Sequence, residues 1–201
     1  MQIIRFRDLV PVPWKNGGGL TREVLRRPPS GAFRWRLSLA EIAASGPFSD
    51  FAGYRRVMML LEGRGVQLRF AGGSAGALRR PGDLIEFDGA LRTECELIEG
   101  PCVDLNLIID ERAPVPEIRV LRETTRLRAE RTMLLVALAG AIVQGAPATA
   151  PGEAVRLARG DTLWLERGAG ELWVAPPTTH RAPAPHAASG PLLFVAERLE
   201  P

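Results

Sequence analysis

The sequence predicts an all-β protein, and three observations carry that prediction. Apolar residues hardly ever recur at the spacing of an amphipathic helix, apart from one short turn around Asp8. Instead, short apolar or alternating segments follow one another, separated by Gly, Pro, Asp or Asn residues. A similar run of strand and turn signals also returns in the second half of the 201-residue chain. Closely spaced strands of this kind are typical of a β-sandwich or barrel.

Ten segments are predicted as strands. The segments 35–39 and 66–70 alternate apolar and polar residues, as half-buried strands do, whereas 57–61 is wholly apolar and fits a buried strand. Turns at 62–65 and 81–83 separate them. The predicted strands are 35–39, 57–61, 66–70, 84–87, 103–109, 134–138, 154–157, 162–165, 171–175 and 192–196.

An internal repeat organises these strands. Leu60–Gly63 resembles Ala137–Gly140, and Arg80–Phe87 resembles Ala158–Leu165, with nearly the same offset in both cases. Each copy reads as strand, Gly turn, strand, and then a Gly-Asp turn that leads into a strand. This order is typical of a cupin-type jelly-roll barrel, so two copies predict a bicupin. The alternative is that Gly-Asp turns recur by chance in a β protein.

The two halves differ in the polarity of their strands. We expect residues 1–112 to form an N-terminal barrel and 113–201 a C-terminal one, with the boundary near residues 111–116. Arg36 and Ser38 share one face of a first-half strand, and Asp104 and Asn106 share one face of another. Buried polar faces need partners or a ligand. Ala and Leu dominate the second half, which we interpret as a degenerate, structural barrel.

The segment Trp14-Lys15-Asn16-Gly17-Gly18-Gly19 contains rare residues. Lys15 is the only lysine, and Asn16 is one of two asparagines, in a chain rich in Arg, Ala, Gly and Pro. We infer that both were retained for their chemistry: a compact ammonium and an amide beside a backbone that a ligand can approach closely. The alternative interpretation is a tight turn whose lysine is incidental.

These polar groups together predict an anion-binding pocket, because an arginine binds a carboxylate through two hydrogen bonds and a lysine adds a point charge. Lys15, Arg36 and Asn106 are the expected main ligand contacts. Asn16, Ser38 and Asp104 would orient the ligand, and Asp104 could pair with a cation or accept a hydrogen bond from an amide or formyl N–H. Arg55 and Arg56 are also candidates, with surface charge as the alternative. The predicted ligand-binding residues are Lys15, Asn16, Gly17, Arg36, Ser38, Ser49, Arg56, Asp104 and Asn106.

Charge and hydropathy argue against nucleic-acid and membrane partners. The net charge is +3, but arginines are spread along the chain among Asp and Glu. The densest basic stretch, 119–131, contains acidic residues and no aromatic residue for base stacking, so a solvated connecting segment is expected. No run of 18 apolar residues and no signal peptide is present, which favours a cytoplasmic protein. The oligomeric state, a homodimer included, stays open.

Histidine and cysteine usage predicts neither a metal nor another cofactor. His180 and His186 are the only histidines, and both stand in one Pro-rich segment rather than at strand spacing. An imidazole site for a first-row metal is therefore not expected, and the two cysteines do not complete a zinc site. Cys95 and Cys102 are interpreted as reduced, buried thiols.

Four blocks of this sequence closely resemble the HutD/Ves family. They are Trp14–Thr21, Trp35–Ile42, Gly46–Gly53 and Gly100–Leu107, in that order. The resemblance is strong over residues 1–110. It implies a bicupin without the usual metal ligands and a link to bacterial histidine utilisation, in which HutD is thought to govern pathway expression. It further implies a pathway intermediate such as N-formylglutamate or urocanate as ligand.

Three functions remain open on the sequence. The first is a protein that binds a small carboxylate and so senses or buffers a histidine-degradation intermediate. The second is a metal-independent lyase, isomerase or deformylase that uses Lys15 or Asp104 as acid–base group. The third is a non-enzymatic interaction protein with a vestigial pocket. No catalytic residue is assigned.

Overall fold

The computed structural model describes residues 1–145, 154–176 and 193–199 and confirms the all-β prediction. Within these ranges the chain forms strands and one 3₁₀ turn, η1 (Phe6–Asp8), close to the predicted helical turn. The strands are β1 (Gln2–Ile4), β2 (Val12–Pro13), β3 (Gly19–Arg27), β4 (Trp35–Ile42), β5 (Gly46–Pro47), β6 (Tyr54–Glu62), β7 (Val66–Phe70), β8 (Ala75–Leu78), β9 (Leu84–Asp88), β10 (Thr93–Leu97), β11 (Cys102–Asp110), β12 (Glu117–Leu121), β13 (Thr125–Arg128), β14 (Met133–Ala137), β15 (Ala141–Gln144), β16 (Ala154–Leu157), β17 (Thr162–Leu165), β18 (Glu171–Ala175) and β19 (Leu193–Glu197).

The ten predicted strands are all present, with somewhat different ends. Nine further strands escaped prediction: β1, β2, β3, β5, β8, β10, β12, β13 and β15. Most of these are short or interrupted by charged residues, so their alternation is weak in the sequence. None of the helices in the described ranges has the length and hydrophobicity needed to cross a membrane.

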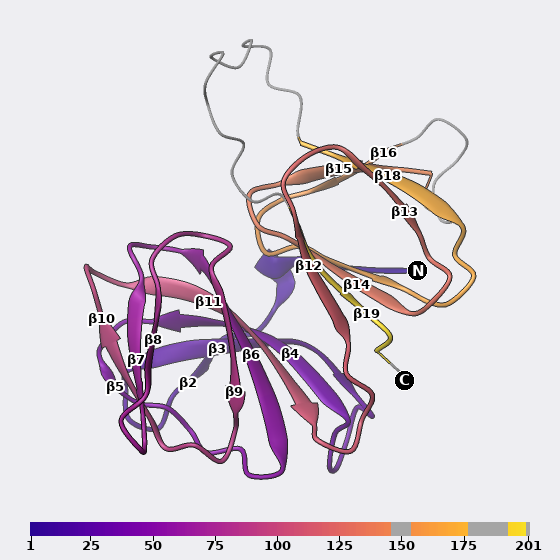
Figure 1. The fold of residues 1–201 in the computed structure, drawn as a ribbon. Helices are drawn as coiled ribbons and strands as arrows, with labels where there is room; N and C mark the ends of the chain where they lie inside the picture. Colours follow the sequence, from indigo (N-terminus) through magenta and orange to yellow (C-terminus); the bar gives the residue numbers. More distant parts are fainter. Residues whose placement is uncertain (146–153, 177–192, 200–201) are drawn as a thin grey trace. The chain divides into compact units, whose positions relative to one another are not determined.

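The chain divides into two compact units, one of which is Leu9–Pro114. Its six-stranded sheet has the order β2-β3-β4-β11-β6-β9, and its four-stranded sheet has the order β5-β10-β7-β8 (Figure 1). Apolar side chains between the sheets form a core that includes Ile42, Met58, Leu60, Leu68 and Cys95. This core occupies only part of the barrel interior, because polar side chains occupy the rest of the same sheet face.

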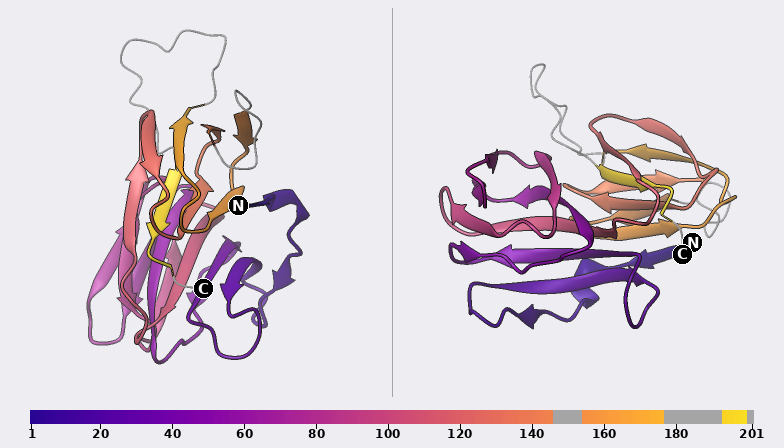
Figure 2. Two further views of the ribbon diagram at one scale, coloured as in Figure 1. Left: turned by 90° about the vertical axis from the view of Figure 1, so that its right-hand side faces the viewer. Right: turned by 60° about the horizontal axis from the view of Figure 1, so that its bottom comes forward.

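The second unit consists of the chain from Val115 on together with Met1–Asp8. Its sheets have the orders β1-β17-β14-β19-β12 and β13-β18-β15-β16, and Figure 2 shows these strands from two further directions. The predicted N-terminal barrel began at residue 1, and this boundary is wrong. Strand β1 pairs with β17, so the first eight residues belong to the C-terminal unit.

The predicted repeat is visible in the strand order of the two units. The order β4-β11-β6-β9 in the first corresponds to β12-β19-β14-β17 in the second. The order β5-β10-β7-β8 likewise corresponds to β13-β18-β15-β16. The Gly-Asp turns also match: Gly82 N donates to Leu60 O and Gly160 N to Ala137 O, at 2.8 Å in both cases.

Asp161 ties the N-terminal segment to the second unit. Its Oδ1 accepts from Phe6 N at 2.9 Å, and its Oδ2 accepts from Arg5 Nη1 at 2.7 Å and from Ala158 N at 3.0 Å. The carboxylate of the corresponding Asp83 accepts from the N–H groups of Arg79 and Arg80 in its own turn. Among the described residues, the contacts of Asp161 with Arg5 and Phe6 therefore have no counterpart at the Asp83 carboxylate.

The interior of the C-terminal unit is apolar. Leucine, valine, alanine and methionine side chains fill it, among them Met133, Leu135, Leu163, Leu172 and Val195. At the repeat offset, Met133 corresponds to Arg56 of the first unit. That this second barrel has a purely structural role stays a prediction.

Candidate functional site

The polar side chains of β4 and β11 lie on one face of the six-stranded sheet. The two strands are antiparallel, and their register places Asn106 opposite Ser38 and Ile108 opposite Arg36. Ile108 is also opposite Arg56 on β6. Alternation along each strand therefore brings these groups together as adjacent rows of one surface.

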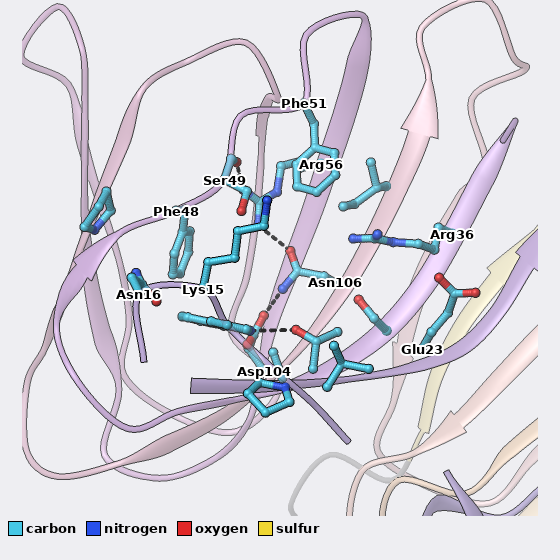
Figure 3. Close-up of a pocket in the computed structure, with 18 residues that line it drawn as sticks. Lys15, Asn16, Glu23, Arg36, Phe48, Ser49, Phe51, Arg56, Asp104 and Asn106 are labelled. Atoms are coloured by element: carbon cyan, nitrogen blue, oxygen red, sulfur yellow. Dashed lines mark hydrogen bonds between the residues drawn. The ribbon is translucent and has the colours of Figure 1, made fainter. Parts of the chain in front are cut away.

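This surface forms the floor of a cavity of about 690 Å³ within the Leu9–Pro114 unit (Figure 3). The volume lies in the range typical of small-molecule sites. Eight of the nine predicted residues line it: Lys15, Asn16, Arg36, Ser38, Ser49, Arg56, Asp104 and Asn106. Gly17 does not line the cavity, and its part in ligand binding stays a prediction. It lies at the turn after Lys15 with φ +71°, and a side chain there would meet no other atom within 4 Å.

Arg56 is the most enclosed cation of the cavity, with 5% of its surface exposed. Its Nη2 donates to Asn106 Oδ1 at 2.7 Å, and its Cζ lies 5.2, 5.4 and 4.9 Å from the ring centroids of Phe48, Phe51 and Phe87. Burial lowers the pKa of Arg56 to about 10, opposed by the charge of Asp104, so the guanidinium remains a cation at neutral pH. The alternative interpretation of Arg56 as surface charge is wrong, because its strand turns it inward.

Arg56 lacks a full set of partners. Its Nε is buried without a hydrogen bond, and its Nη1 reaches only the carbonyl oxygen of Ser49, at 3.4 Å. No carboxylate of the described residues forms an ion pair with it within 4.0 Å. A buried guanidinium that is bonded mainly to a neutral amide retains capacity for an anion.

Arg36 provides a second cation on the same floor. Its Cζ lies 5.1 Å from the ring centroid of Phe51 and 5.5 Å from that of Phe33, and its Nε is also buried without a partner. Burial lowers the pKa of Arg36, Glu23 raises it, and Arg26 lowers it further. Phe51 thus lies beside both guanidinium groups.

Asp104 and Asn106 complete the floor from β11. Asp104 has no exposed surface; its Oδ2 accepts a hydrogen bond from Asn106 Nδ2, whereas its Oδ1 is buried without a partner. Burial raises the pKa of Asp104 to about 7, although Arg56, its own backbone N–H and Asn106 act in the opposite direction. Both ends of the Asn106 amide are used, one by Arg56 and the other by Asp104.

The Lys15 segment is a tight turn beside this floor. Trp14 N donates to Gly19 O at 2.9 Å, and Gly17 N donates to Trp14 O at 3.0 Å. A Cβ on Gly19 would lie 2.3 Å from Glu41 O and 3.2 Å from the Trp14 ring, so only glycine fits. Asn16 contributes to the turn as well, because its Oδ1 accepts from Gly18 N at 3.0 Å.

Lys15 itself extends from this turn over the cavity (Figure 3). Lys15 forms no salt bridge or hydrogen bond with any residue of the ranges that the structure describes. The segment can therefore be a tight turn and still present Lys15 to a ligand. The glycines shape the backbone, and the ammonium stays available for an anion.

Several lining residues were missed by the prediction. Phe48 and Phe51 flank the arginines, and Trp14 packs edge-on against Phe48 with ring centroids 6.1 Å apart. Trp14 Nε1 also donates to Thr21 Oγ1 at 2.7 Å. The aromatic residues stand in blocks that the family resemblance already contained. Thr21 and Glu23 lie on β3, which was not predicted as a strand, so their shared face could not be inferred.

The lining suits a transition metal poorly. Three cations and two carboxyl groups line the cavity, without a histidine or cysteine. Across the described ranges, no group of three or more His, Cys, Asp and Glu side chains is placed to hold a metal ion. His180 and His186 lie outside the described residues, so the prediction of no metal stays a prediction.

The densest basic stretch is more structured than predicted. It contains β12 and β13 rather than a simple connecting segment. Arg119 pairs with Glu197, while Arg126 and Arg128 both pair with Glu171. These partly exposed ion pairs explain how the stretch is charged without forming a uniformly basic surface.

Fold and site together define a cupin-type β protein with a cation-rich, aromatic-walled pocket in its first unit. A sequence model of the HutD family matches residues 7–181, and the chain belongs to this family. The resemblance inferred from the four sequence blocks is thereby confirmed.

Individual relatives agree with this assignment. An uncharacterized 21.2 kDa protein in the hutC 3′ region of Pseudomonas putida is 36% identical over 83% of this chain and 87% of its own. Protein Ves of Citrobacter koseri is 35% identical over 70% of this chain and 74% of its own. The structure of HutD from Pseudomonas fluorescens superposes with a TM-score of 0.77 at 30% identity, covering 96% of both chains.

A more distant structure supports the fold alone. Oxalate decarboxylase of Lactobacillus farciminis superposes with a TM-score of 0.60 at 9% identity, over 98% of this chain and 85% of that one. At this identity the comparison says nothing about the chemistry of the pocket.

Proposed function

We propose that this protein binds a small carboxylate in the Leu9–Pro114 unit and that binding, not turnover, is its function. The observation that carries the proposal is the state of Arg56: a buried cation without a carboxylate partner among the described residues, held on aromatic rings at the floor of a cavity. Lys15 and Arg36 add positive charge along the same lining. An anion would complete the hydrogen bonding of these groups in a partly desolvated setting.

The ligand is a carboxylate intermediate of histidine degradation, N-formylglutamate or urocanate, and its binding lets the protein sense or buffer that intermediate and so govern the pathway. Membership of the HutD family and the relative in a hutC 3′ region support this context. The planar urocanate fits the aromatic walls formed by Phe48, Phe51 and Trp14, and the two carboxylates of N-formylglutamate match the cations.

Calorimetric titration of the full chain with N-formylglutamate, urocanate and glutamate tests the proposal. We expect saturable binding of N-formylglutamate or urocanate and weaker binding of glutamate, whose ammonium would approach the pocket cations. Arg69→Met is the matched control for pocket-charge variants, because Arg69 is exposed on β7 and pairs with Glu96. Failure of all three compounds to bind would contradict the proposal and favour an interaction protein with a vestigial pocket.

Asp104 supports a second candidate, a metal-independent enzyme. A pocket carboxyl with a pKa of about 7 is suited to act as a general acid or base near neutral pH. Incubation with each intermediate followed by mass spectrometry separates the two functions. A product that forms with wild type and not with Asp104→Asn would establish an enzyme, whereas binding of an unchanged compound establishes the sensor.

A further inference from the structure

The charged groups of the pocket do not balance a dicarboxylate when both carboxyl groups are ionised. Lys15, Arg36 and Arg56 contribute three positive charges, and Glu23 and Asp104 contribute two negative ones, which leaves +1. A proton on Asp104 would leave +2, the charge that a dicarboxylate neutralises. The two carboxyl groups differ in their surroundings, because Glu23 is exposed at the pocket whereas Asp104 has no exposed surface.

The hydrogen bonds of Asp104 are those of a group that can carry a proton. A fully buried carboxylate ion ordinarily accepts several hydrogen bonds, because its charge has lost its water. Asp104 Oδ2 accepts from Asn106 Nδ2, but Oδ1 has no donor within the described part of the chain. A protonated Oδ1 would instead donate, and it would need an acceptor in the pocket rather than a donor.

The fixed orientation of Asn106 leaves Oδ1 as the site for that proton. Arg56 Nη2 donates to Asn106 Oδ1 at 2.7 Å, so the amide turns its Nδ2 toward Asp104. Oδ2 must therefore remain an acceptor, and only Oδ1 can carry the hydrogen. Arg56 in this way sets both the charge beside Asp104 and the oxygen that takes up the proton.

We propose that Asp104 takes up one proton from solvent when a dicarboxylate binds, and that its protonated Oδ1 donates a hydrogen bond to a ligand carboxylate. Binding then couples to pH, and Asp104 determines whether the pocket favours a dianion or a monoanion. This inference rests on the proposed function and deepens it by naming the charge class of the ligand. The raised pKa of Asp104 is consistent with it, because the energetic cost of protonation at neutral pH is small.

Three titratable groups near Asp104 keep one protonation state in this range. Burial raises the pKa of Cys95 to about 12 and also raises that of Cys102, so both thiols stay neutral. Arg56 remains charged, with its pKa lowered to about 10. The charged and titratable side chains around the pocket and Asp104, from β3, β4, β6, β10, β11 and the Lys15 turn, are Glu23, Arg36, Arg56, Cys95, Cys102 and Lys15.

The test is calorimetric titration of the full chain with N-formylglutamate and with glutarate, in two buffers of different ionisation enthalpy. Both ligands are fully ionised at pH 7 and above, so a buffer-dependent heat reports protons taken up by the protein. For wild type we expect about half a proton per ligand at pH 7, rising toward one at pH 8, and affinity about tenfold weaker at pH 8 than at pH 6. Asp104→Asn should remove both effects, because the amide cannot titrate.

The outcomes separate this inference from the function on which it rests. Binding without proton uptake, or uptake that persists in Asp104→Asn, overturns the inference and leaves carboxylate binding intact. No binding of either dicarboxylate or of urocanate overturns both. The ¹³Cγ shift of Asp104 in wild type provides a second measurement that does not depend on the folding of Asp104→Asn. It should titrate near neutral pH without ligand and move to higher pH with glutarate, and an ionised Asp104 in the bound state at pH 6 would overturn the inference.

Discussion

Arg56 and Asn106 are joined by a 2.7 Å hydrogen bond although 50 positions separate them in the chain. The bond crosses between neighbouring strands β6 and β11 and lies at the floor of the cavity. It uses a neutral amide oxygen, so the guanidinium charge is oriented without being neutralised. This arrangement prepares a cation for an external anion while keeping it fixed on the aromatic rings around it.

Replacing Arg56 should weaken ligand binding strongly. Arg56→Met removes a charge-assisted hydrogen bond, for which we expect a loss of about 1.5–3 kcal/mol, or roughly 10- to 150-fold in Kd for N-formylglutamate. Calorimetric titration measures the change, and Arg69→Met, with the same charge change on an exposed strand, should bind like wild type. A Kd that is equal in all three proteins would contradict a role for Arg56 in binding.

Replacing Lys15 tests whether the lone lysine contacts the ligand. Lys15→Met should weaken binding by about 1.5–3 kcal/mol, and Lys15→Arg by less, because a guanidinium keeps the charge but not the shape. Thermal stability should hardly change, since the exposed Lys15 side chain has no partner in the described residues. Unchanged affinity in both variants would mean that Lys15 is only a turn residue.

Asp161 should matter for stability and not for ligand selectivity. Asp161→Asn weakens the bonds to Arg5, Phe6 and Ala158, and we expect a loss of about 1–3 kcal/mol in the free energy of unfolding. Asp83→Asn is the matched control in the other turn and should cost less, because the Asp83 carboxylate bonds backbone N–H groups and forms no ion pair with an arginine side chain of the described residues. Thermal unfolding measures both, and loss of binding with unchanged stability would contradict the assignment of the two units.

The lowered pKa of Asp161 predicts how stability changes with pH. Burial raises the pKa of Asp161, but the hydrogen bonds from Arg5, Phe6 and Ala158 outweigh it, and the net shift is downward. Its stabilisation is therefore present above the unfolded-state pKa and is lost as pH falls through the folded-state value. Between neutral and acidic pH, wild type should lose more stability than Asp161→Asn, as followed by denaturant unfolding.

The two thiols should be unreactive in the native protein. Cys95 and Cys102 are buried free thiols that form no disulfide with each other. Burial raises the pKa of Cys95 to about 12. Because the thiolate is the reactive form, we expect slow modification by a thiol reagent at pH 8 and fast modification of both groups after unfolding. Rapid reaction of the folded protein would show that the barrel opens readily.

Alternation and turn chemistry made much of the fold predictable. The ten segments with clear alternation or apolar runs are all strands, because burial of one or both strand faces imposes those patterns. Strands β1, β2 and β5 contain two or three residues each, too few for a pattern to be recognised. The pairing of β1 with β17 within the C-terminal unit depends on contacts between distant parts of the chain, which local sequence does not encode.

The candidate site, like the fold, was predictable from the sequence only in part. The sequence by itself determined that Arg36 with Ser38, and Asp104 with Asn106, share strand faces, and that Lys15 stands in a glycine-bounded turn, because these features follow from backbone geometry over a few residues. Only the tertiary structure decided that Arg56 lies on Phe48, Phe51 and Phe87, and that Asp104 keeps one oxygen without a partner. Such properties arise from register between distant strands and from exclusion of water, and both exist only once the barrel has closed around its polar face.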